Sequence, residues 1–147
     1  MEKISILLEW VNLNIDAISE IEEVTDPNEI LRLRKGDCTE ISDLSAALLK
    51  SIGIPARTVT GYFGGIVEGG DYSFGGHQWN EVAIEGKWVA LDPTWDMLLE
   101  GSLVHIKTNE NDTDENLQKK FKLRLDAIRY KGGSLTYFNK DGQIKYQ

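Results

Sequence analysis

The chain has 147 residues, a length typical of one domain with its own hydrophobic core. Hydrophobic residues make up 41% and charged residues 27%, as in ordinary soluble globular proteins. The net charge of −8 argues against nucleic-acid binding, and the single cysteine excludes an internal disulfide framework.

No apolar run is long enough to cross a membrane, and the longest lie at residues 4–11 and 46–49. The N-terminal segment lacks a small-residue cleavage site, so we interpret it as an amphipathic helix and not as a signal peptide. Since no signal peptide or membrane span is seen, we expect a cytoplasmic protein without a membrane partner. The net charge likewise predicts no nucleic-acid partner. The sequence is also compatible with a domain cut from a longer protein.

Two helices are predicted before the cysteine. The first has an apolar stripe at helical spacing, made of Ile4, Leu7, Leu8 and Val11. The second begins in the segment TDPNE, where Asp26 can cap the helix, Pro27 can take its first position and Glu29 can complete a capping box. This helix is short, and Gly36 then turns the chain toward the cysteine.

The segment GDCTEISDLSAALLKSIG, residues 36–53, predicts a helix that carries Cys38 in its first turn. Asp37 can cap this helix, and Gly53 and Pro55 provide its end. One face is predicted to be buried and consists of Ile41, Leu44, Leu48 and Ile52. Unpaired N–H groups and the helix dipole favour a thiolate at such a position. Since a lone cysteine is more often a small buried hydrophobe, a nucleophile also needs a matching histidine and carboxylate.

The next segments are a strand and a glycine-rich region. The run ARTVTGYF, residues 56–63, predicts a strand. Residues 61–76 contain many glycines and aromatic residues, which indicates a loop that acts as a flap over a cleft or as a flexible connection. Phosphate binding is rejected because this loop leads into another strand and not into a helix.

Residues 77–96, HQWNEVAIEGKWVALDPTWD, give the strongest local pattern, a β-hairpin with its turn at Glu85-Gly86. Pairing of Ile84 with Lys87 sets the register. One face then carries His77, Trp79, Glu81, Ala83, Trp88, Ala90, Asp92 and Thr94, and the other carries Val82, Ile84, Val89 and Leu91. His77 and Asp92 become diagonal neighbours, about 7 Å apart at the backbone and within side-chain reach.

The C-terminal third is less informative. Residues 113–130 predict an amphipathic helix with Leu117, Phe121, Leu125 and Ile128 on one face. Residues 135–147 indicate a closing hairpin that turns at residues 140–142. His105 lies in a β-like run, residues 102–107, and no partner is assigned to it.

Cys38, His77 and Asp92 together supply the groups that thiol acyl transfer needs. Such chemistry requires a thiolate, a histidine that accepts and returns the proton, and a third group that orients the imidazole. The alternative is a half-buried histidine on a strand and an aspartate that only serves the turn before Pro93. Their placement on one hairpin face favours the catalytic interpretation.

Three ordered blocks resemble the transglutaminase-like superfamily of papain-related thiol enzymes: GDC with GIPAR, then HQWNEV, then KWVALDPTWD, together within about residues 30–96. The resemblance implies a single domain over residues 1–147 with an α+β fold, in which the nucleophile helix packs on an antiparallel sheet. It implies that Cys38 is the nucleophile, His77 the general base and acid, and Asp92 the residue that orients His77.

The sequence departs from the family at three points. Gln78 stands where the family usually has a small residue, and residues 97–147 match nothing in the family. A second oxyanion donor is not identifiable, so the backbone N–H of Cys38 is the one donor that we name.

The resemblance implies an enzyme that acts on peptide or amide bonds of a peptide or protein substrate. We favour hydrolysis, as in a cysteine protease or amidase, over transfer of the acyl group to an amine, as in a protein-glutamine gamma-glutamyltransferase. A catalytically inactive peptide-binding module is the third possibility. No cofactor is expected, and one cysteine with two histidines lacks the spacing of a zinc site. The acidic chain slightly favours basic or neutral peptides.

Overall fold

The computed structural model describes residues 1–18, 22–67, 72–95, 97–99, 105–108, 112–113, 115–117, 119–120, 122, 136–138 and 144–146. The chain forms two compact units. The first consists of Met1–Thr60 and His77–Ser102, and the second of Gly61–Gly76 and Leu103–Gln147. Strands β3 (Ala56–Val67) and β4 (Tyr72–Ile84) contribute residues to both units, and each unit is described by itself.

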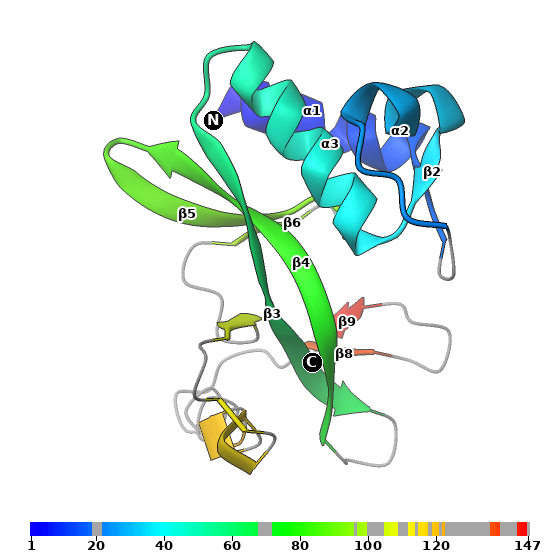
Figure 1. Cartoon of the computed structure of the whole chain (residues 1–147). Helices are drawn as coiled ribbons and strands as arrows, with labels where there is room; N and C mark the ends of the chain where they lie inside the picture. The colour runs from blue at the N-terminus through cyan, green and yellow to red at the C-terminus, as the bar shows by residue number, and fades with distance from the viewer. Residues whose placement is uncertain are drawn as a thin grey trace. The chain divides into compact units, whose positions relative to one another are not determined.

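The described residues of the first unit form the helices α1 (Glu2–Asn14), α2 (Pro27–Leu33) and α3 (Cys38–Ser51), shown in Figure 1. The short strand β1 (Asp16–Ala17) follows α1, and the short strand β2 (Lys35–Gly36) follows α2. These two strands pair in parallel. The predicted stripe of α1 is confirmed, since Ile4, Leu8 and Val11 are buried.

The start of α2 is confirmed in part. The Asp26 carboxylate accepts the N–H of Asn28 at 3.0 Å, as expected of a cap. The predicted capping box is wrong, because the Glu29 carboxylate instead accepts from the Arg32 guanidinium at 2.6 Å. An exposed i,i+3 ion pair therefore takes the carboxylate that the sequence motif assigned to the helix start.

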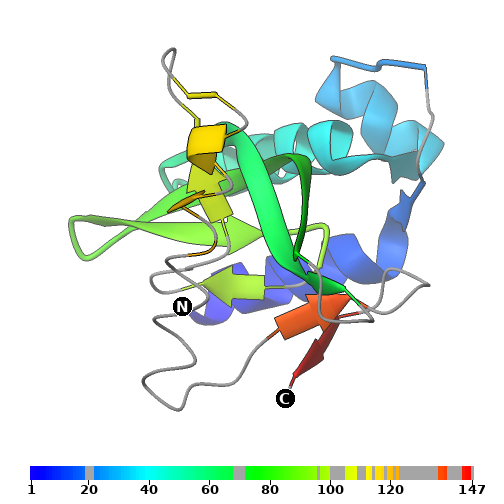
Figure 2. The same ribbon diagram turned by 90° about the horizontal axis from the view of Figure 1, so that it is seen from below.

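The sheet of the first unit has the strand order β6-β5-β4-β3, with β5 spanning Lys87–Asp92 and β6 spanning Met97–Leu99. β4 pairs antiparallel with β5, and β5 pairs antiparallel with β6. One core cluster joins α1 and α3 to these strands and consists of Ile4, Leu8, Ala46, Leu49, Ala56, Val82 and Leu91. The predicted α+β fold, with the cysteine helix packed on an antiparallel sheet, is confirmed (Figures 1 and 2).

The buried face of α3 differs from the prediction at its C-terminal end. Ile41 and Leu44 are buried as predicted, but Ile52 is 46% exposed and Leu49 is fully buried. The physical reason is that α3 ends at Ser51, so Ile52 lies at the C-cap and no longer follows the helical period.

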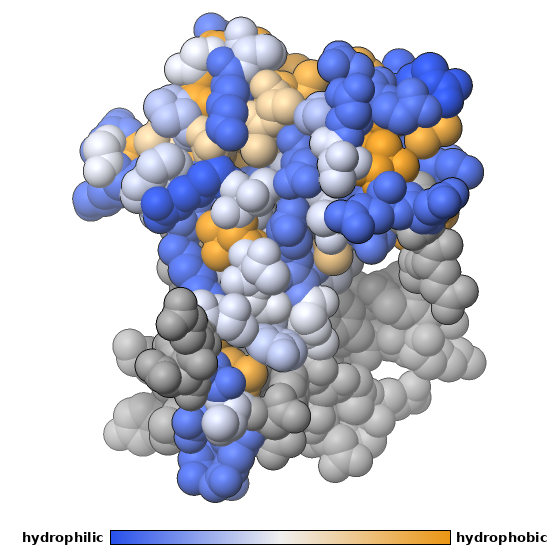
Figure 3. All heavy atoms as spheres, viewed as in Figure 1, coloured by the Kyte–Doolittle hydropathy of each residue, from blue (hydrophilic) through white to orange (hydrophobic). Residues whose placement is uncertain are grey.

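In the space-filling view of Figure 3, apolar residues form small patches between hydrophilic ones.

The prediction of a loop over residues 61–76 is wrong for the residues that the structure describes, which lie in strands. β3 continues to Val67 and β4 begins at Tyr72, while residues 68–71 lie outside the described part. Within the second unit, residues 61–63 pair with residues 105–107, and residues 66–67 pair with residues 137–138. These distant strands satisfy the backbone groups, which outweighs the weak strand propensity of glycine.

The second unit also contains β7 (His105–Lys107), β8 (Thr136–Phe138) and β9 (Ile144–Tyr146). β8 pairs antiparallel with β9, which confirms the closing hairpin, although its turn lies outside the described residues. Of the helix predicted over 113–130, residues 115–117, 119–120 and 122 are helical and the other predicted helical residues are mostly undescribed. No helix among the described residues combines the length and apolar character needed to cross a bilayer.

Candidate active site

Cys38 is the first residue of α3, and the predicted helix start is confirmed. The Asp37 carboxylate accepts the N–H of Thr39 at 2.6 Å, and the Glu40 carboxylate accepts the N–H of Asp37 at 3.0 Å. The Asp37 side chain also accepts the backbone N–H of Glu40, so the side chains and backbones of Asp37 and Glu40 bond reciprocally in a capping box. The half-buried Cys38 therefore lies at the positive end of a well-capped helix, where a thiolate is favoured.

Glu40 also anchors the start of α3 from outside the helix. Its side chain is buried and accepts the N–H of Val24 at 3.2 Å. Gly36 packs against it so closely that a Cβ atom at position 36 would lie 2.5 Å from the Glu40 Cβ. Position 36 therefore requires glycine for steric reasons. The first turn of α3 is held by its cap and by the contacts of Glu40 with Gly36 and Val24.

The hairpin register is as predicted, from Ile84 opposite Lys87 to Asn80 opposite Leu91. Glu85 and Gly86 adopt positive φ angles of 50° and 77°, the conformation of a two-residue type I′ turn. Because Asn80, Val82 and Leu91 turn toward the helices, strand alternation leaves His77 and Asp92 for the opposite face.

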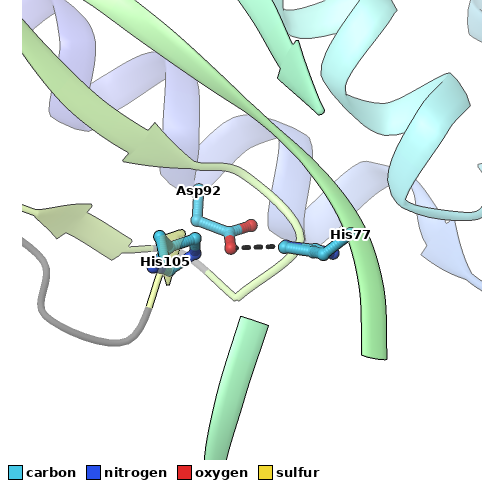
Figure 4. A group of neighbouring side chains, drawn as sticks. All are labelled: His77, Asp92 and His105. Carbon is cyan, nitrogen blue, oxygen red and sulfur yellow. Dashed lines mark hydrogen bonds and ion pairs between the residues drawn. The ribbon is translucent and has the colours of Figure 1, made fainter. Parts of the chain in front are cut away.

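His77 and Asp92 meet as predicted. The ring atom Nε2 of His77 lies 2.7 Å from Oδ2 of Asp92, and Figure 4 shows this bond as a dashed line. The side chains are nearly inaccessible, with residue exposures of 7% and 0%. The other oxygen of Asp92 accepts the N–H of Thr94 at 3.1 Å, so the carboxylate serves the turn as well. With Nε2 engaged, Nδ1 is the ring nitrogen that remains for Cys38.

Two tryptophans lie against the imidazole of His77. The Trp95 ring stacks on it with 4.3 Å between centroids, and the fully buried Trp79 lies 6.1 Å away at a similar tilt. Stacked rings hold the imidazole in one orientation and keep water from the His77–Asp92 bond.

The pKa of His77 reflects two opposed effects. Burial disfavours the charged imidazolium, but hydrogen bonds to Asp92 and Cys38 and their negative charges outweigh it. The result raises the pKa of His77 to about 9, so the ring is protonated at neutral pH.

The pKa of Cys38 moves in the opposite direction. The hydrogen bond to His77 lowers it most, and the backbone N–H of Gln78 and the charge of His77 lower it further. Burial and the charge of Asp37 oppose this shift without reversing it. A lowered thiol pKa beside a raised imidazole pKa favours a thiolate–imidazolium pair, the arrangement that thiol acyl transfer needs. A metal ion on His77 and Asp92 would have to replace their mutual hydrogen bond.

Sequence reasoning missed the polar contacts between β4 and α3. Gln78 and Asn80 extend from β4 to residues of α3, among them Ser42, which is fully buried. The signal was available in part, because alternation along β4 puts Gln78 and Asn80 on one face and Gln78 is unusual at its position. On the other face, the buried Glu81 pairs with Arg57 at 2.6 Å.

Comparisons with known proteins agree with this architecture. A family model described as "Transglutaminase-like superfamily" matches residues 1–93, which include Cys38, His77 and Asp92. The kyphoscoliosis peptidase of Mus musculus is 30% identical over 103 residues, which are 65% of this chain and 16% of that protein. A protein-glutamine gamma-glutamyltransferase of Pseudomonas aeruginosa is 38% identical over 68 residues, which are 42% of this chain and 10% of that protein.

One solved structure is similar in fold and sequence. It is the crystal structure of a "putative cysteine protease" from Cytophaga hutchinsonii, with a TM-score of 0.53 and 29% identity. The match covers 63% of this chain and 30% of that one. The chain therefore spans less than a third of the length of each of these three proteins.

Proposed function

The chain belongs to the transglutaminase-like superfamily, and from this premise we propose that it is a thiol-dependent acyl-transfer enzyme that hydrolyses peptide or amide bonds. Cys38 is the nucleophile, His77 the general acid and base, and Asp92 the group that orients His77. The substrate is a peptide or protein, and no cofactor takes part.

One observation carries the proposal. Nε2 of His77 lies 2.7 Å from a buried carboxylate oxygen of Asp92, and the same imidazole is the main cause of the lowered pKa of Cys38 at the start of α3. The names of the peptidase relatives from Mus musculus and Cytophaga hutchinsonii support hydrolysis. A structural histidine would need neither the helix-start thiol nor the sulfur contact.

The chemistry divides into two halves. The thiolate attacks the carbonyl carbon, the oxyanion accepts the backbone N–H of Cys38, and His77 gives its Nδ1 proton to the amide nitrogen as the C–N bond breaks. This leaves a thioester and a neutral imidazole. Water then attacks the thioester, His77 takes the water proton, the C–S bond breaks, and the acid product leaves while the thiolate–imidazolium pair is restored.

Transfer to an amine is the second candidate, favoured by the relative from Pseudomonas aeruginosa. The first half-reaction is the same, and a primary amine replaces water in the second half. The two candidates therefore differ in the acceptor and not in the three residues.

A panel of peptide amides, with and without a primary amine, tests the proposal and separates the two candidates. Wild-type protein is expected to release ammonia or amine product and to leave a free acid, while Cys38→Ala and protein alkylated by iodoacetamide release none. A new amide in place of the acid would establish amine transfer. Release that persists in Cys38→Ala contradicts both candidates, and loss of activity on metal chelation contradicts the cofactor-free mechanism.

A further inference from the structure

We infer that Gln78 is a positioning residue, which fixes β4 on the first turns of α3 so that the Cys38 sulfur and the His77 imidazole stay in contact. The inference rests on the proposed function and deepens it. Gln78 directly follows His77 on β4, and its partners on α3 directly follow Cys38 or lie one turn further on.

The side chain of Gln78 forms a clamp on α3. Its amide nitrogen donates to the backbone carbonyl of Thr39 at 3.3 Å and to Oδ1 of Asp43 at 3.0 Å. Both hydrogens of one NH₂ group are therefore used on two successive turns of the same helix. This arrangement ties the residue after His77 to the residue after Cys38.

The backbone of Gln78 adds a second connection through Ser42. The Ser42 hydroxyl lies 2.9 Å from the Gln78 carbonyl oxygen and 2.6 Å from the Cys38 carbonyl oxygen. Because a hydroxyl has one hydrogen, the carbonyl oxygens of Cys38 and Gln78 share it, and both are held close to the Ser42 side chain. The backbone N–H of Gln78 also favours the thiolate of Cys38 and so lowers the pKa of the thiol.

Asn80 repeats the pattern one step along the strand. Its amide nitrogen donates to the Ser42 carbonyl at 3.0 Å, and both side chains are fully buried. Further along the same face, Val82 packs with Ala46 and Leu49 in the apolar core. Apolar packing stabilises the strand on the helix without fixing its alignment closely, whereas directional hydrogen bonds fix it. The polar contacts are thus concentrated at the end of α3 that carries Cys38.

The test uses the pH profile of iodoacetamide alkylation, which reports the single cysteine of the chain and needs no substrate. Gln78→Met keeps the length of the side chain and removes its donors. We expect the midpoint of the profile to rise by roughly 0.5 to 1 pH unit as the sulfur–imidazole contact loosens. Ser42→Ala removes the shared hydroxyl and is expected to shift the midpoint in the same direction. Asn28→Leu, which removes an amide on α2, serves as the matched control with a wild-type midpoint.

A merely structural role for Gln78 predicts a lower thermal midpoint and an unchanged alkylation profile. If wild-type protein shows a low thiol midpoint, and neither Gln78→Met nor Ser42→Ala changes it, the inference is overturned while the proposed function stands. If wild-type protein already shows an ordinary thiol midpoint, both are overturned, because no activated thiolate exists to be positioned.

Discussion

The carboxylate of Asp92 divides its oxygens between His77 and the N–H of Thr94. Asparagine can still accept a hydrogen bond from the Thr94 N–H, but its NH₂ group cannot accept one from the N–H of the imidazole. Asp92→Asn is therefore expected to lower kcat by about 10-fold to 1000-fold with little change in KM, as for a group that acts in the transition state. Steady-state kinetics and a thermal melt of this variant provide the check.

Asp26→Asn is the matched control, because Asp26 caps α2 and asparagine caps helices equally well. Its activity and thermal midpoint should match those of the wild type. Unchanged activity in Asp92→Asn, or a loss that only follows unfolding, would show that the carboxylate serves the turn and not the imidazole.

The opposed pKa shifts of Cys38 and His77 have a calculable effect on stability. The raised pKa of His77 gives stability that is complete below an unfolded value of about 6.5 and is lost as the pH rises through the folded value. The lowered pKa of Cys38 gives stability that is complete above an unfolded value of about 8.5 and is lost as the pH falls through the folded value. Between these two pH values the folded pair and the unfolded pair each hold one proton, so the pH dependences of the two contributions cancel and the pair's contribution to stability is constant.

Cys38→Ala removes the thiol, and with it the contribution of Cys38 to the pH dependence of stability. The variant keeps the contact with Asp92 that raises the pKa of His77 and loses the contribution of Cys38. We therefore expect the folded state to hold a proton that the unfolded state has lost above about pH 6.5. The unfolding free energy of the variant should then fall with rising pH, by up to about 1.4 kcal/mol per pH unit, while the wild type shows no such slope. Urea unfolding at several pH values checks this, and parallel slopes in the two proteins would contradict the ion pair.

At the scale of elements, the start of α3 depends on the fit between Gly36 and Glu40. A methyl group at position 36 would lie 2.5 Å from the Glu40 Cβ and would push away the carboxylate that caps Asp37 and holds Val24. Gly36→Ala is therefore expected to lower the unfolding free energy by about 1–3 kcal/mol, measured by urea unfolding. Gly75→Ala is the control, since nothing lies within 4 Å of its Cβ position. Equal stability of the two variants would refute the steric role.

The hairpin that carries His77 and Asp92 turns through Glu85, which has a φ of 50°. This left-handed conformation is strained for glutamate and favourable for asparagine, the residue preferred at this turn position. Glu85→Asn should raise the unfolding free energy by roughly 0.5–1 kcal/mol without changing activity. A destabilised variant in urea unfolding would mean that the turn, and with it the strand register, is not as described.

The elements with strong local patterns were predictable from the sequence. The cysteine helix and the hairpin register follow from side-chain period and turn chemistry, and both are confirmed. Contacts between distant segments were not predictable, because residues 61–67 become a strand only through partners at residues 105–107 and 137–138. The capping box predicted at the start of α2 is absent because Arg32 binds the Glu29 carboxylate, and sequence motifs do not reveal such a competing ion pair. At the start of α3, where the sequence predicts only a cap at Asp37, Glu40 completes a capping box.

At the scale of the whole molecule, the family model ends at residue 93 and covers every residue of the proposed triad. The proximity of His77 to Asp92 could be predicted because both lie on one hairpin. The approach of Cys38 to His77 depends on how α3 packs on the sheet, which the sequence supports only through the family resemblance. The clamp of Gln78, Ser42 and Asn80 needs coordinates, because hydrogen bonds across elements leave no periodic pattern.

The proposed function depends on a thiolate–imidazolium pair of Cys38 and His77, and the alkylation rate of Cys38 measured against pH reports directly on that pair. For the wild type we expect a midpoint clearly below the ordinary thiol value of about 8.5, and His77→Ala should return it toward that value. A circular dichroism spectrum of His77→Ala confirms that the variant is folded. A wild-type midpoint at the ordinary value that His77→Ala leaves unchanged would contradict the pair and the catalytic function proposed from it.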